Sequence, residues 1–231
     1  MAFEDLTAVI PVREKQDLSD TSLLSFGDVT LLEWKVIQLK HVLPPERIVL
    51  STNSDRAAEL VKPYGVRVVK RDKEYCREGL PFSKVTSGII AKVEAKHVAI
   101  CPSTAPMLGP RVYKAAFTRY CQNLKSRKKL SLTTVNEMRD YIWDGKKPLN
   151  YPPAGEFPQA KDLPVWYRFT NGLFIMEKRR MLEKGYFIDE NPDLFVIDRL
   201  AGMDLIYFDD YKLTRELLSY YLSREIGPSD S

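Results

Sequence analysis

Polar and basic residues directly follow four short apolar runs in the first half of this 231-residue chain. These polar segments lie at 11–15, 51–55, 70–73 and 102–106. The first contains Arg13, whose guanidinium group can bind phosphate oxygens in a forked geometry. If the four segments meet at one edge of a fold, they supply what a nucleotide site requires. The simpler alternative for Arg13 is a salt bridge on the protein surface.

The apolar runs before these segments are predicted to be strands, and helical patterns separate them. The strands are expected at 6–11, 47–51, 66–70 and 97–101. The helices are expected at 31–42, 54–64, 82–93 and 110–122, the second capped by Ser54 or Asp55 and ended by Gly65. Nearly all-apolar, β-branched strands that alternate with single helices indicate an α/β fold whose mostly parallel sheet is covered on both faces. Because ligands bind beyond the carboxyl ends of such strands, the polar segments should lie together.

The second half of the chain has a different pattern. Antiparallel strands are predicted at 131–137 and 139–143, and a proline-rich, aromatic stretch follows at 147–166. The prolines exclude a helix or a central strand in this stretch. The remaining elements are a strand at 172–176, a short helix, a strand at 204–207 and a final amphipathic helix at 209–222.

Large apolar side chains are concentrated in and after the proline-rich stretch. They are Tyr151, Phe157, Trp166, Tyr167 and Phe169. So many groups of this kind are rarely left exposed together on a monomer. We therefore predict a small antiparallel dimerisation arm at 139–171, and hence a homodimer. The alternative is that these side chains cover the sheet of their own chain.

Length and composition favour a single domain over 1–231 that includes this arm. The formal net charge of +4 is no nucleic-acid signature, so no nucleic-acid partner is expected. The three cysteines form an odd, sparse set, which argues against a disulfide framework and suits a reducing compartment. No apolar run approaches the roughly 20 residues that span a bilayer. We therefore expect a cytoplasmic protein without a membrane partner.

Several short motifs follow one another in a characteristic order. They are Ile10-Pro11-Val12-Arg13, Leu50-Ser51-Thr52-Asn53-Ser54, Pro102-Ser103-Thr104-Ala105-Pro106-Met107, Pro148-Leu149-Asn150-Tyr151, Asp162-Leu163-Pro164 and Asn171-Gly172. The series is similar to I-P-A-R, V-S-T-D-S, Q-P-T-S-P-L, P-L-N-Y, D-L-P and N-G in the acylneuraminate cytidylyltransferases, the CMP-sialic acid synthetase-like enzymes. The chain resembles a divergent member of this family from about residue 6 to residue 217.

The resemblance implies a three-layer, Rossmann-like nucleotidyltransferase and a reaction of CTP with a 2-keto sugar acid. The products would be a CMP-sugar for surface glycan biosynthesis and pyrophosphate. Mg²⁺ would be the cofactor that offsets the triphosphate charge. The anomeric hydroxyl of the sugar would attack the α-phosphorus, and catalysis would rest on positioning and charge neutralisation.

The resemblance also assigns roles to individual residues. Arg13 and Lys15 would act at the triphosphate as catalytic residues, and the nucleotide contacts would come from Arg13, Ser22, Arg71 and Ser83. The sugar contacts would come from Ser103, Thr104 and Asn171, and Asp204 would be the metal ligand. The simpler roles are a solvated loop position for Lys15, a cap for Ser22 or Ser83, and a turn for Asn171.

The chain departs from the family pattern at three places. Glu14-Lys15-Gln16-Asp17 replaces G-G-S-K, so no glycine lets backbone amides approach a phosphate there. Pro102 replaces a glutamine that touches the sugar, and Ile206 replaces a second metal-binding aspartate. Asp210 matches the last acidic position of the family and is expected to cap the final helix.

These departures leave three hypotheses open. The first is an active CMP-sugar synthetase for a sialic-acid-like sugar. The second is a catalytically impaired homologue that acts as a nucleotide-binding or partner-binding non-catalytic subunit. The third is a nucleotidyltransferase or GT-A-like enzyme that uses another nucleotide or sugar.

Overall fold

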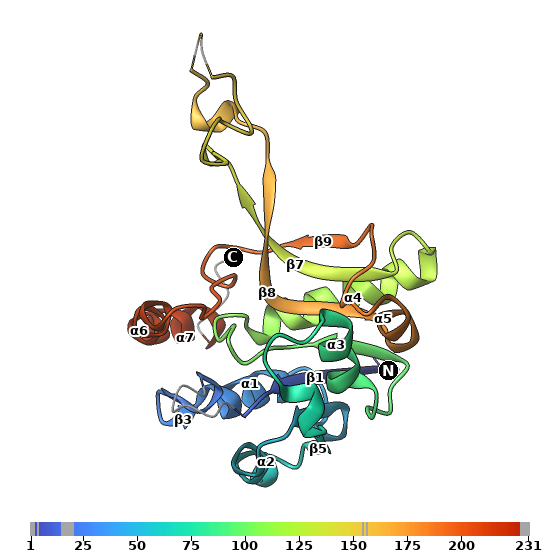
Figure 1. The fold of residues 1–231 in the computed structure, drawn as a ribbon. Helices are drawn as coiled ribbons and strands as arrows, with labels where there is room; N and C mark the ends of the chain where they lie inside the picture. The colour runs from blue at the N-terminus through green and yellow to red at the C-terminus, as the bar shows by residue number, and fades with distance from the viewer. Residues whose placement is uncertain (1–2, 4, 15–20, 154, 156, 227–231) are drawn as a thin grey trace.

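A seven-stranded sheet forms the middle layer of the protein, in the order β5-β4-β1-β6-β8-β7-β9 (Figure 1). The computed structural model describes residues 3, 5–14, 21–153, 155 and 157–226. The strands are β1 (Leu6–Val12), β4 (Ile48–Thr52), β5 (Arg67–Lys70), β6 (His97–Ile100), β7 (Ser131–Met138), β8 (Trp166–Glu177) and β9 (Asp193–Val196). β1, β4, β5 and β6 are parallel, β8 is antiparallel to β6 and β7, and β9 is parallel to β7. The short strands β2 (Ser25–Phe26) and β3 (Val29–Thr30) form a separate antiparallel pair.

Helices cover both faces of the large sheet. One face is packed by α1 (Leu31–Lys40), α2 (Asp55–Val61) and α4 (Pro110–Ser126), and the other by α3 (Phe82–Ile90) and α5 (Lys178–Lys184). Neighbouring residues of β1 serve opposite faces, since Ala8 and Ile10 belong to the first core and Val9 to the second. The predicted α/β class, with a mostly parallel sheet between two helical layers, is confirmed.

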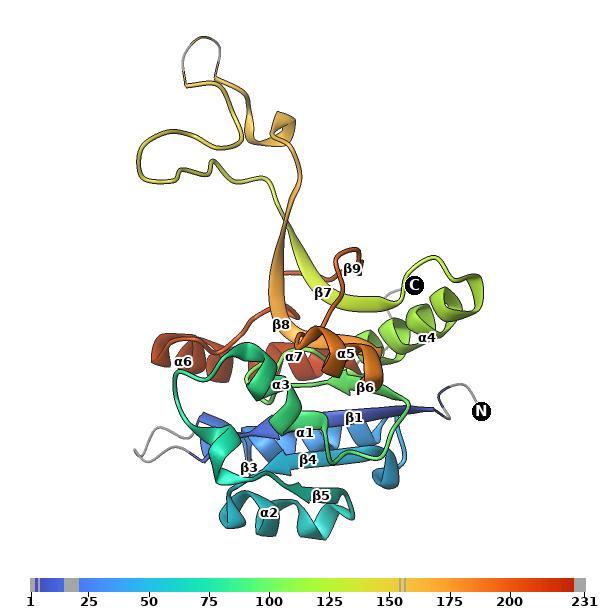
Figure 2. The same cartoon turned by 45° about the vertical axis from the view of Figure 1, so that its right-hand side comes forward.

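The two C-terminal helices form a third apolar cluster on the side to which the parallel strands point (Figure 2). α6 (Phe208–Glu216) and α7 (Leu218–Ile226) contribute Tyr211 and Tyr221, which pack with Phe26 and Leu31. Across the described ranges, no helix is both long and apolar enough to cross a membrane.

Local sequence signals explain where the helices start and end. Thr30 and Glu33 form a capping box at α1, because each side chain accepts a hydrogen bond from the other residue's backbone N–H. The Ser54 hydroxyl accepts a hydrogen bond from the N–H of Ala57, so its predicted role as the cap of α2 is confirmed. Gly65 ends the following turn with φ +70°, a conformation that favours glycine.

Three predicted elements are wrong. Residues 139–143 are not a strand, because the N–H of Ile142 is bound by the side chain of Asn150 in a local turn. Residues 204–207 are not a strand either, since Asp210 accepts hydrogen bonds from the N–H groups of Ile206 and Tyr207 and starts α6 there. The same contacts confirm Asp210 as a helix cap. The predicted helix at 209–222 is interrupted at Leu217, between α6 and α7.

The predicted arm projects away from the three layers as a continuation of β7 and β8 (Figures 1 and 2). Because β8 already begins at Trp166, the irregular part is confined to 139–165, and within it Trp143 and Pro148 form an isolated bridge. Tyr141, Tyr151 and Phe157 pack against one another, with ring centroids 5.2–5.9 Å apart. Phe157 is nevertheless 66% exposed. These three rings therefore pack with one another in the irregular part of the arm.

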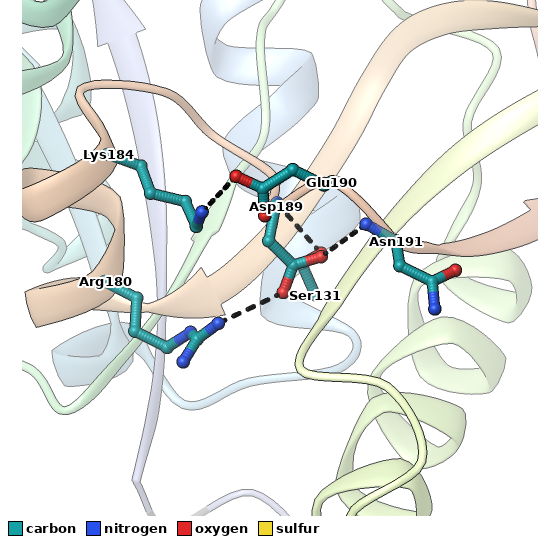
Figure 3. A network of polar contacts seen from close by, with 6 residues as sticks. All are labelled: Ser131, Arg180, Lys184, Asp189, Glu190 and Asn191. Atoms are coloured by element: carbon teal, nitrogen blue, oxygen red, sulfur yellow. Dashed lines mark hydrogen bonds and ion pairs between the residues drawn. The ribbon is translucent and has the colours of Figure 1, made fainter.

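A polar network fixes the segment that leads from α5 to β9 (Figure 3). Asp189 accepts a hydrogen bond from the Ser131 hydroxyl at 2.8 Å and pairs with Arg180 of α5 at 3.5 Å. Lys184 and Glu190 form a second ion pair across the same turn. The network holds Phe187 and its neighbours against Phe82, with ring centroids 5.0 Å apart, and so supports the start of α3.

We expect Gly185→Ala to destabilise the protein by about 2–3 kcal/mol, because two unfavourable effects add. Gly185 ends α5 with φ +63°, and a Cβ atom there would lie 2.5 Å from the Cβ of Ser83. Gly65→Ala is the matched control: its φ is +70°, but its Cβ would lie 3.9 Å from its nearest neighbour, so only about 1 kcal/mol should be lost. Urea unfolding measures both, and equal losses would contradict the close contact with α3.

Candidate active site

Two arginines predicted to bind the nucleotide lie beside the same cavity. Pro11, Arg13, Arg71, Tyr75, Arg77 and Val85 line this cavity, which has a volume of about 180 Å³. Arg13 follows β1 and Arg71 follows β5, so the parallel topology brings them to the same edge of the sheet. The structure therefore confirms that these two residues come together, although they are 58 positions apart (71 − 13).

Arg71 is buried and binds the ends of the strands beside it. Its Nη2 donates hydrogen bonds to the carbonyl oxygens of Ser51 at 2.7 Å and Val12 at 3.2 Å. Burial first, and the charge of Arg13 second, lower the pKa of the Arg71 guanidinium. This side chain thus joins the ends of β1 and β4 and places positive charge at the cavity.

The loop after β1 is described only as far as Glu14. Arg13 forms an ion pair with Glu78 at 3.2 Å, which is the salt bridge of the simpler alternative. The N–H of Glu14 donates to the side chain of Asn53 at 2.9 Å, and this bond ties the loop to the end of β4. Lys15, the other predicted catalytic residue, lies outside the described residues.

Hydroxyl groups from two predicted positions meet after the end of β6, where Ser22, in the short 3₁₀ helix η1 (Thr21–Leu23), contacts Ser103. The Ser103 hydroxyl donates a hydrogen bond to the Ser22 hydroxyl at 3.0 Å. Ser103 is buried, whereas Ser22 and Thr104 are half-buried. The carbonyl oxygen of Thr104 accepts a hydrogen bond from the N–H of Leu205 at 2.8 Å, so the segment of the predicted metal ligand lies against this loop.

Asn171 and Asp204, predicted separately, are in direct contact. The Asn171 side-chain amide donates to the Asp204 carboxylate at 2.8 Å. Asn171 has φ +51°, and the pairing of β8 with β7 shifts register between Thr133 and Val135. Asn171 therefore also has the conformational role of the simpler alternative, since it occupies an irregular position in β8. This position directs its side-chain amide toward Asp204.

Glycine at position 172 lets this part of β8 approach the loop after β6. A Cβ atom there would lie 3.1 Å from the side chain of Leu108 and 3.5 Å from Ala105. Asn171-Gly172 thus couples a polar contact with a close backbone approach. Ser22, Ser103, Thr104, Asn171 and Asp204 consequently form one hydroxyl and carboxylate half of the site.

Asp204 supplies a single carboxylate for a magnesium ion. Mg²⁺ is commonly held by one or two carboxylates together with substrate phosphates, so one carboxylate is sufficient when a triphosphate supplies the remaining oxygens. In the described part of the chain, no three His, Cys, Asp or Glu side chains gather as metal ligands. Ile206, at the second acidic position of the family, is 66% exposed and offers no ligand.

Ser83 does not join either half of the site. It lies within the first turn of α3, whose N-cap is Pro81, and it packs beside Gly185 at the end of α5. Its predicted role as a cap is wrong, because the helix begins one residue earlier. A nucleotide contact from Ser83 remains a prediction, and the residue is not among those that line the cavity.

Three side chains of α1 hold the loop that carries Ser103 and Thr104. The Lys35 ammonium donates to the carbonyl oxygen of Ala105 at 2.7 Å and to the Tyr113 hydroxyl at 2.8 Å. The carbonyl oxygen of Pro106 accepts hydrogen bonds from Trp34 at 2.9 Å and Gln38 at 2.7 Å. Sequence reasoning missed these residues. The signal was the presence of Lys35 and Gln38 at helical spacing with the apolar residues of the predicted helix.

Known proteins similar to this chain were found by sequence and by structure. No protein-family model matches the chain. The post-translational flagellin modification protein B of Campylobacter coli is 21% identical over 214 residues, which cover 87% of this chain and 89% of that protein. A solved CMP-2-keto-3-deoxy-manno-octonic acid synthetase in complex with CTP superposes with a TM-score of 0.64, at 13% identity over 94% of this chain and 99% of the other.

A second solved structure, 4-diphosphocytidyl-2C-methyl-D-erythritol synthase from Anaerococcus prevotii, has a TM-score of 0.62 at 13% identity, and covers 93% of this chain and 96% of the other. The chain has the cytidylyltransferase fold. This finding confirms the resemblance stated from the motifs. In this cytidylyltransferase fold, the arginine cavity and the hydroxyl and carboxylate half both lie where the parallel strands end.

Lys35 is expected to make the stability of the protein depend on pH. Burial lowers the pKa of Lys35 from 10.5 to about 7, so between these values the folded state binds fewer protons than the unfolded state. The contribution of Lys35 to stability therefore falls as the pH drops from 10.5 to 7 and is lowest below pH 7. Between pH 7.5 and 9.5 it should increase by about 2 kcal/mol.

Urea unfolding at both pH values gives the free energy of unfolding of the wild type and of Lys35→Met. The difference between the two proteins should change by this amount from the lower pH to the higher one. The exposed Lys40, on the same helix, provides the control variant Lys40→Met, which should keep the pH dependence of the wild type. An identical pH dependence in all three proteins would contradict the assignment.

Proposed function

We propose that this chain is a cytidylyltransferase that transfers CMP from CTP to a 2-keto sugar acid of the sialic-acid type. The proposal rests on one observation: in a cytidylyltransferase fold, Ser103 bonds Ser22, Asn171 bonds Asp204, and an arginine-lined cavity lies at the ends of β1 and β5. The anomeric hydroxyl of the sugar attacks the α-phosphorus of CTP. The bond between the α-phosphorus and the bridging oxygen breaks, pyrophosphate leaves, and the hydroxyl proton passes to solvent.

The residues act mainly by binding and orientation. Arg13 and Arg71 neutralise phosphate charge, and neither needs to change its protonation state. Ser22 and Ser103 offer hydroxyl groups to the ribose or the sugar, and their mutual hydrogen bond fixes their relative position. Asn171 keeps one oxygen of Asp204 engaged and so orients the carboxylate.

Mg²⁺, held by Asp204 together with oxygens of CTP, would offset negative charge on the phosphates. The carboxylate is half-buried and belongs to the segment that the carbonyl oxygen of Thr104 anchors through Leu205. A metal ion at this position would therefore be supported by the same loop that carries Ser103.

The sequence relative supports a place in surface glycan biosynthesis, since it is named for flagellin modification. The solved synthetase that binds CTP acts on a 2-keto sugar acid, which supports the same class of acceptor here. The replacement of the family's sugar-binding glutamine by Pro102 removes one hydrogen-bonding group from the acceptor site. The acceptor of this protein therefore differs in detail from that of the typical family member.

The purified protein should release pyrophosphate when it is incubated with Mg²⁺, CTP and the correct member of a panel of 2-keto sugar acids. Asp204→Asn should lower kcat/KM by about 100-fold, because it removes a carboxylate beside the reacting phosphates. Asn171→Ala should lower it by about 10-fold or more, through loss of orientation.

The control is Asp209→Asn, since this nearby carboxylate is exposed and pairs only with Lys212 of its own helix in the described structure. It should leave kcat/KM unchanged. Calorimetric binding of CTP without pyrophosphate release for any sugar would favour the non-catalytic hypothesis. Absence of CTP binding would refute the proposal.

The exposed aromatic residues of the arm support a homodimer. Trp143, Phe157 and Tyr167 are 56%, 66% and 44% exposed, although they lie on one projecting segment. Burying them against a second copy would remove a large apolar area from water. The arm of one protomer thus provides the contact surface for its partner.

Sedimentation at micromolar concentration should give twice the mass of the 231-residue chain, and Trp143→Ser combined with Phe157→Ser should shift the protein toward the monomer. Val68→Thr is the control, because Val68 is 42% exposed but lies on the edge strand β5, away from the arm. A monomeric wild type would rule out the dimer, and an unchanged mass of the double variant would exclude the arm as its interface.

A further inference from the structure

The cavity at the ends of β1 and β5 contains more positive charge than the family resemblance assigns to it. Besides Arg13 and Arg71, its lining includes Arg77, which follows the short 3₁₀ helix η4 (Lys73–Cys76). The cavity measures about 180 Å³, whereas one water molecule needs about 10–15 Å³ of such space. There is room for an anion with several heavy atoms.

Two features show that the positive charge of this cavity is incompletely neutralised. Arg71 is only 5% exposed, yet its Nε has no hydrogen-bond partner among the described residues. Arg77 is exposed and has no ion-pair partner in the part of the chain that the structure describes. A buried donor left without a partner is unfavourable, and an anionic ligand would relieve this.

The approach of η4 to α3 brings Arg77 to the cavity. Gly88 of α3 makes this approach possible, because any Cβ atom there would overlap the Cβ of Tyr75. The aliphatic part of Arg71 lies against the same glycine, at 3.5 Å from the position of that Cβ atom. The arrangement of Arg71, Tyr75 and Arg77 is therefore set by helix packing rather than by a flexible surface loop.

We propose that Arg77 is a third phosphate-binding residue beside Arg13 and Arg71. Before the nucleotide binds, the carboxylate of Glu78 pairs with the guanidinium group of Arg13, and the phosphates of the nucleotide then displace this carboxylate. This inference rests on the proposed function and deepens it, since it names the residues that receive the triphosphate. Three guanidinium groups around one cavity suit a polyphosphate, whereas the single carboxylate of a sugar acid needs fewer positive charges.

The proposal accounts for the missing glycines of the phosphate loop. Glu14-Lys15-Gln16-Asp17 contains no glycine, so side chains must supply donors that backbone amides supply elsewhere. Arg77 lies on a different segment and adds five N–H donors of fixed geometry. Phosphate recognition thereby moves from the loop after β1 to the segment after β5.

Glu78 is suited to act as an internal competitor. Its side chain is 88% exposed, and its only ion pair in the described structure is the 3.2 Å contact with Arg13. An exposed pair of this kind is weak, so a polyphosphate with several charges can replace the carboxylate.

Calorimetry with inorganic pyrophosphate alone, in a buffer with EDTA, tests this subsite independently of metal and turnover. Arg77→Gln should weaken pyrophosphate binding by about tenfold or more, since it removes charge-assisted hydrogen bonds. Glu78→Gln should strengthen binding by about two- to five-fold, since it removes the competing carboxylate. Both side chains are exposed, and thermal melting checks that the variants remain folded.

The chain offers a matched control pair. Arg67 and Glu94 form an ion pair at 3.3 Å with side-chain exposures of 39% and 88%, close to the 33% and 88% of Arg13 and Glu78. Arg67→Gln and Glu94→Gln make the same changes in net charge away from the cavity lining. Both should leave pyrophosphate binding unchanged.

The outcomes separate this inference from the proposed function. If Arg77→Gln behaves like Arg67→Gln, or Glu78→Gln binds no more tightly than Glu94→Gln, the phosphate subsite is refuted even when the wild type turns over CTP. If the wild type neither binds nor consumes CTP but the pyrophosphate results are as expected, the subsite stands and the cytidylyltransferase proposal fails.

Discussion

The buried ammonium of Lys35 holds the loop on which half of the candidate site is built. Lys35 is fully buried and binds the carbonyl oxygen of Ala105, at the point where the chain leaves β6. Among the described residues, no carboxylate pairs with it, and burial raises the pKa of the neighbouring Cys101 thiol to about 12, so that group remains neutral. The penalty for burying the amine is offset by the carbonyl oxygen of Ala105, the Tyr113 hydroxyl and the face of the Tyr113 ring. The cost of burying this amine is tolerable where a loop must be held in one conformation. Here the loop after β6 is held so that it presents Ser103 and Thr104.

The same loop connects the two ends of the chain. Gln38 binds both the carbonyl oxygen of Pro106 and the Tyr221 hydroxyl of α7, which links the N-terminal helix α1 to the C-terminal helices. The N–H of Leu205 then binds the carbonyl oxygen of Thr104, and this bond places Asp204 next to the loop. The metal candidate thus depends on contacts formed by residues more than 90 positions away in the sequence. A local disturbance at Pro106 would be transmitted to Asp204 through this chain of contacts, without any change in the residues that bind substrate.

The parallel half of the fold could be predicted from the sequence because its signals are local. Runs such as Arg47–Ser51 and caps such as Ser54 contain their own information, and the strand order then follows from simple connection rules. The contacts of Asn171 with Asp204 and of Ser103 with Ser22 could be expected only from the resemblance, since each joins residues that are distant in the sequence. Arg77 gave no local signal that distinguishes it from an ordinary charged residue of a loop. For Lys35 the only signal was its helical spacing with the apolar residues of α1, which does not reveal that it binds the loop after β6. The strand predicted at 204–207 is wrong because its run of three apolar residues, Leu205 to Tyr207, precedes a cap, Asp210, that directs the backbone into a helix.

The candidate site is divided into two halves, and this division fits the proposed chemistry in a divergent sequence. In nucleotidyl transfer, the phosphates require positive charge, whereas the acceptor requires orientation by hydrogen bonds. Here the positive charge comes from side chains after β1 and β5, and the orienting groups come from the loop after β6 and from β8. Because different strands carry the two proposed functions, a loop after β1 without glycines is compatible with the contact between Asn171 and Asp204. Conversely, isoleucine at position 206 removes a carboxylate but leaves the arginine cavity unchanged. In the proposed reaction, Asp204 would then be the one protein carboxylate named for the metal, while the affinity for the nucleotide phosphates would be preserved.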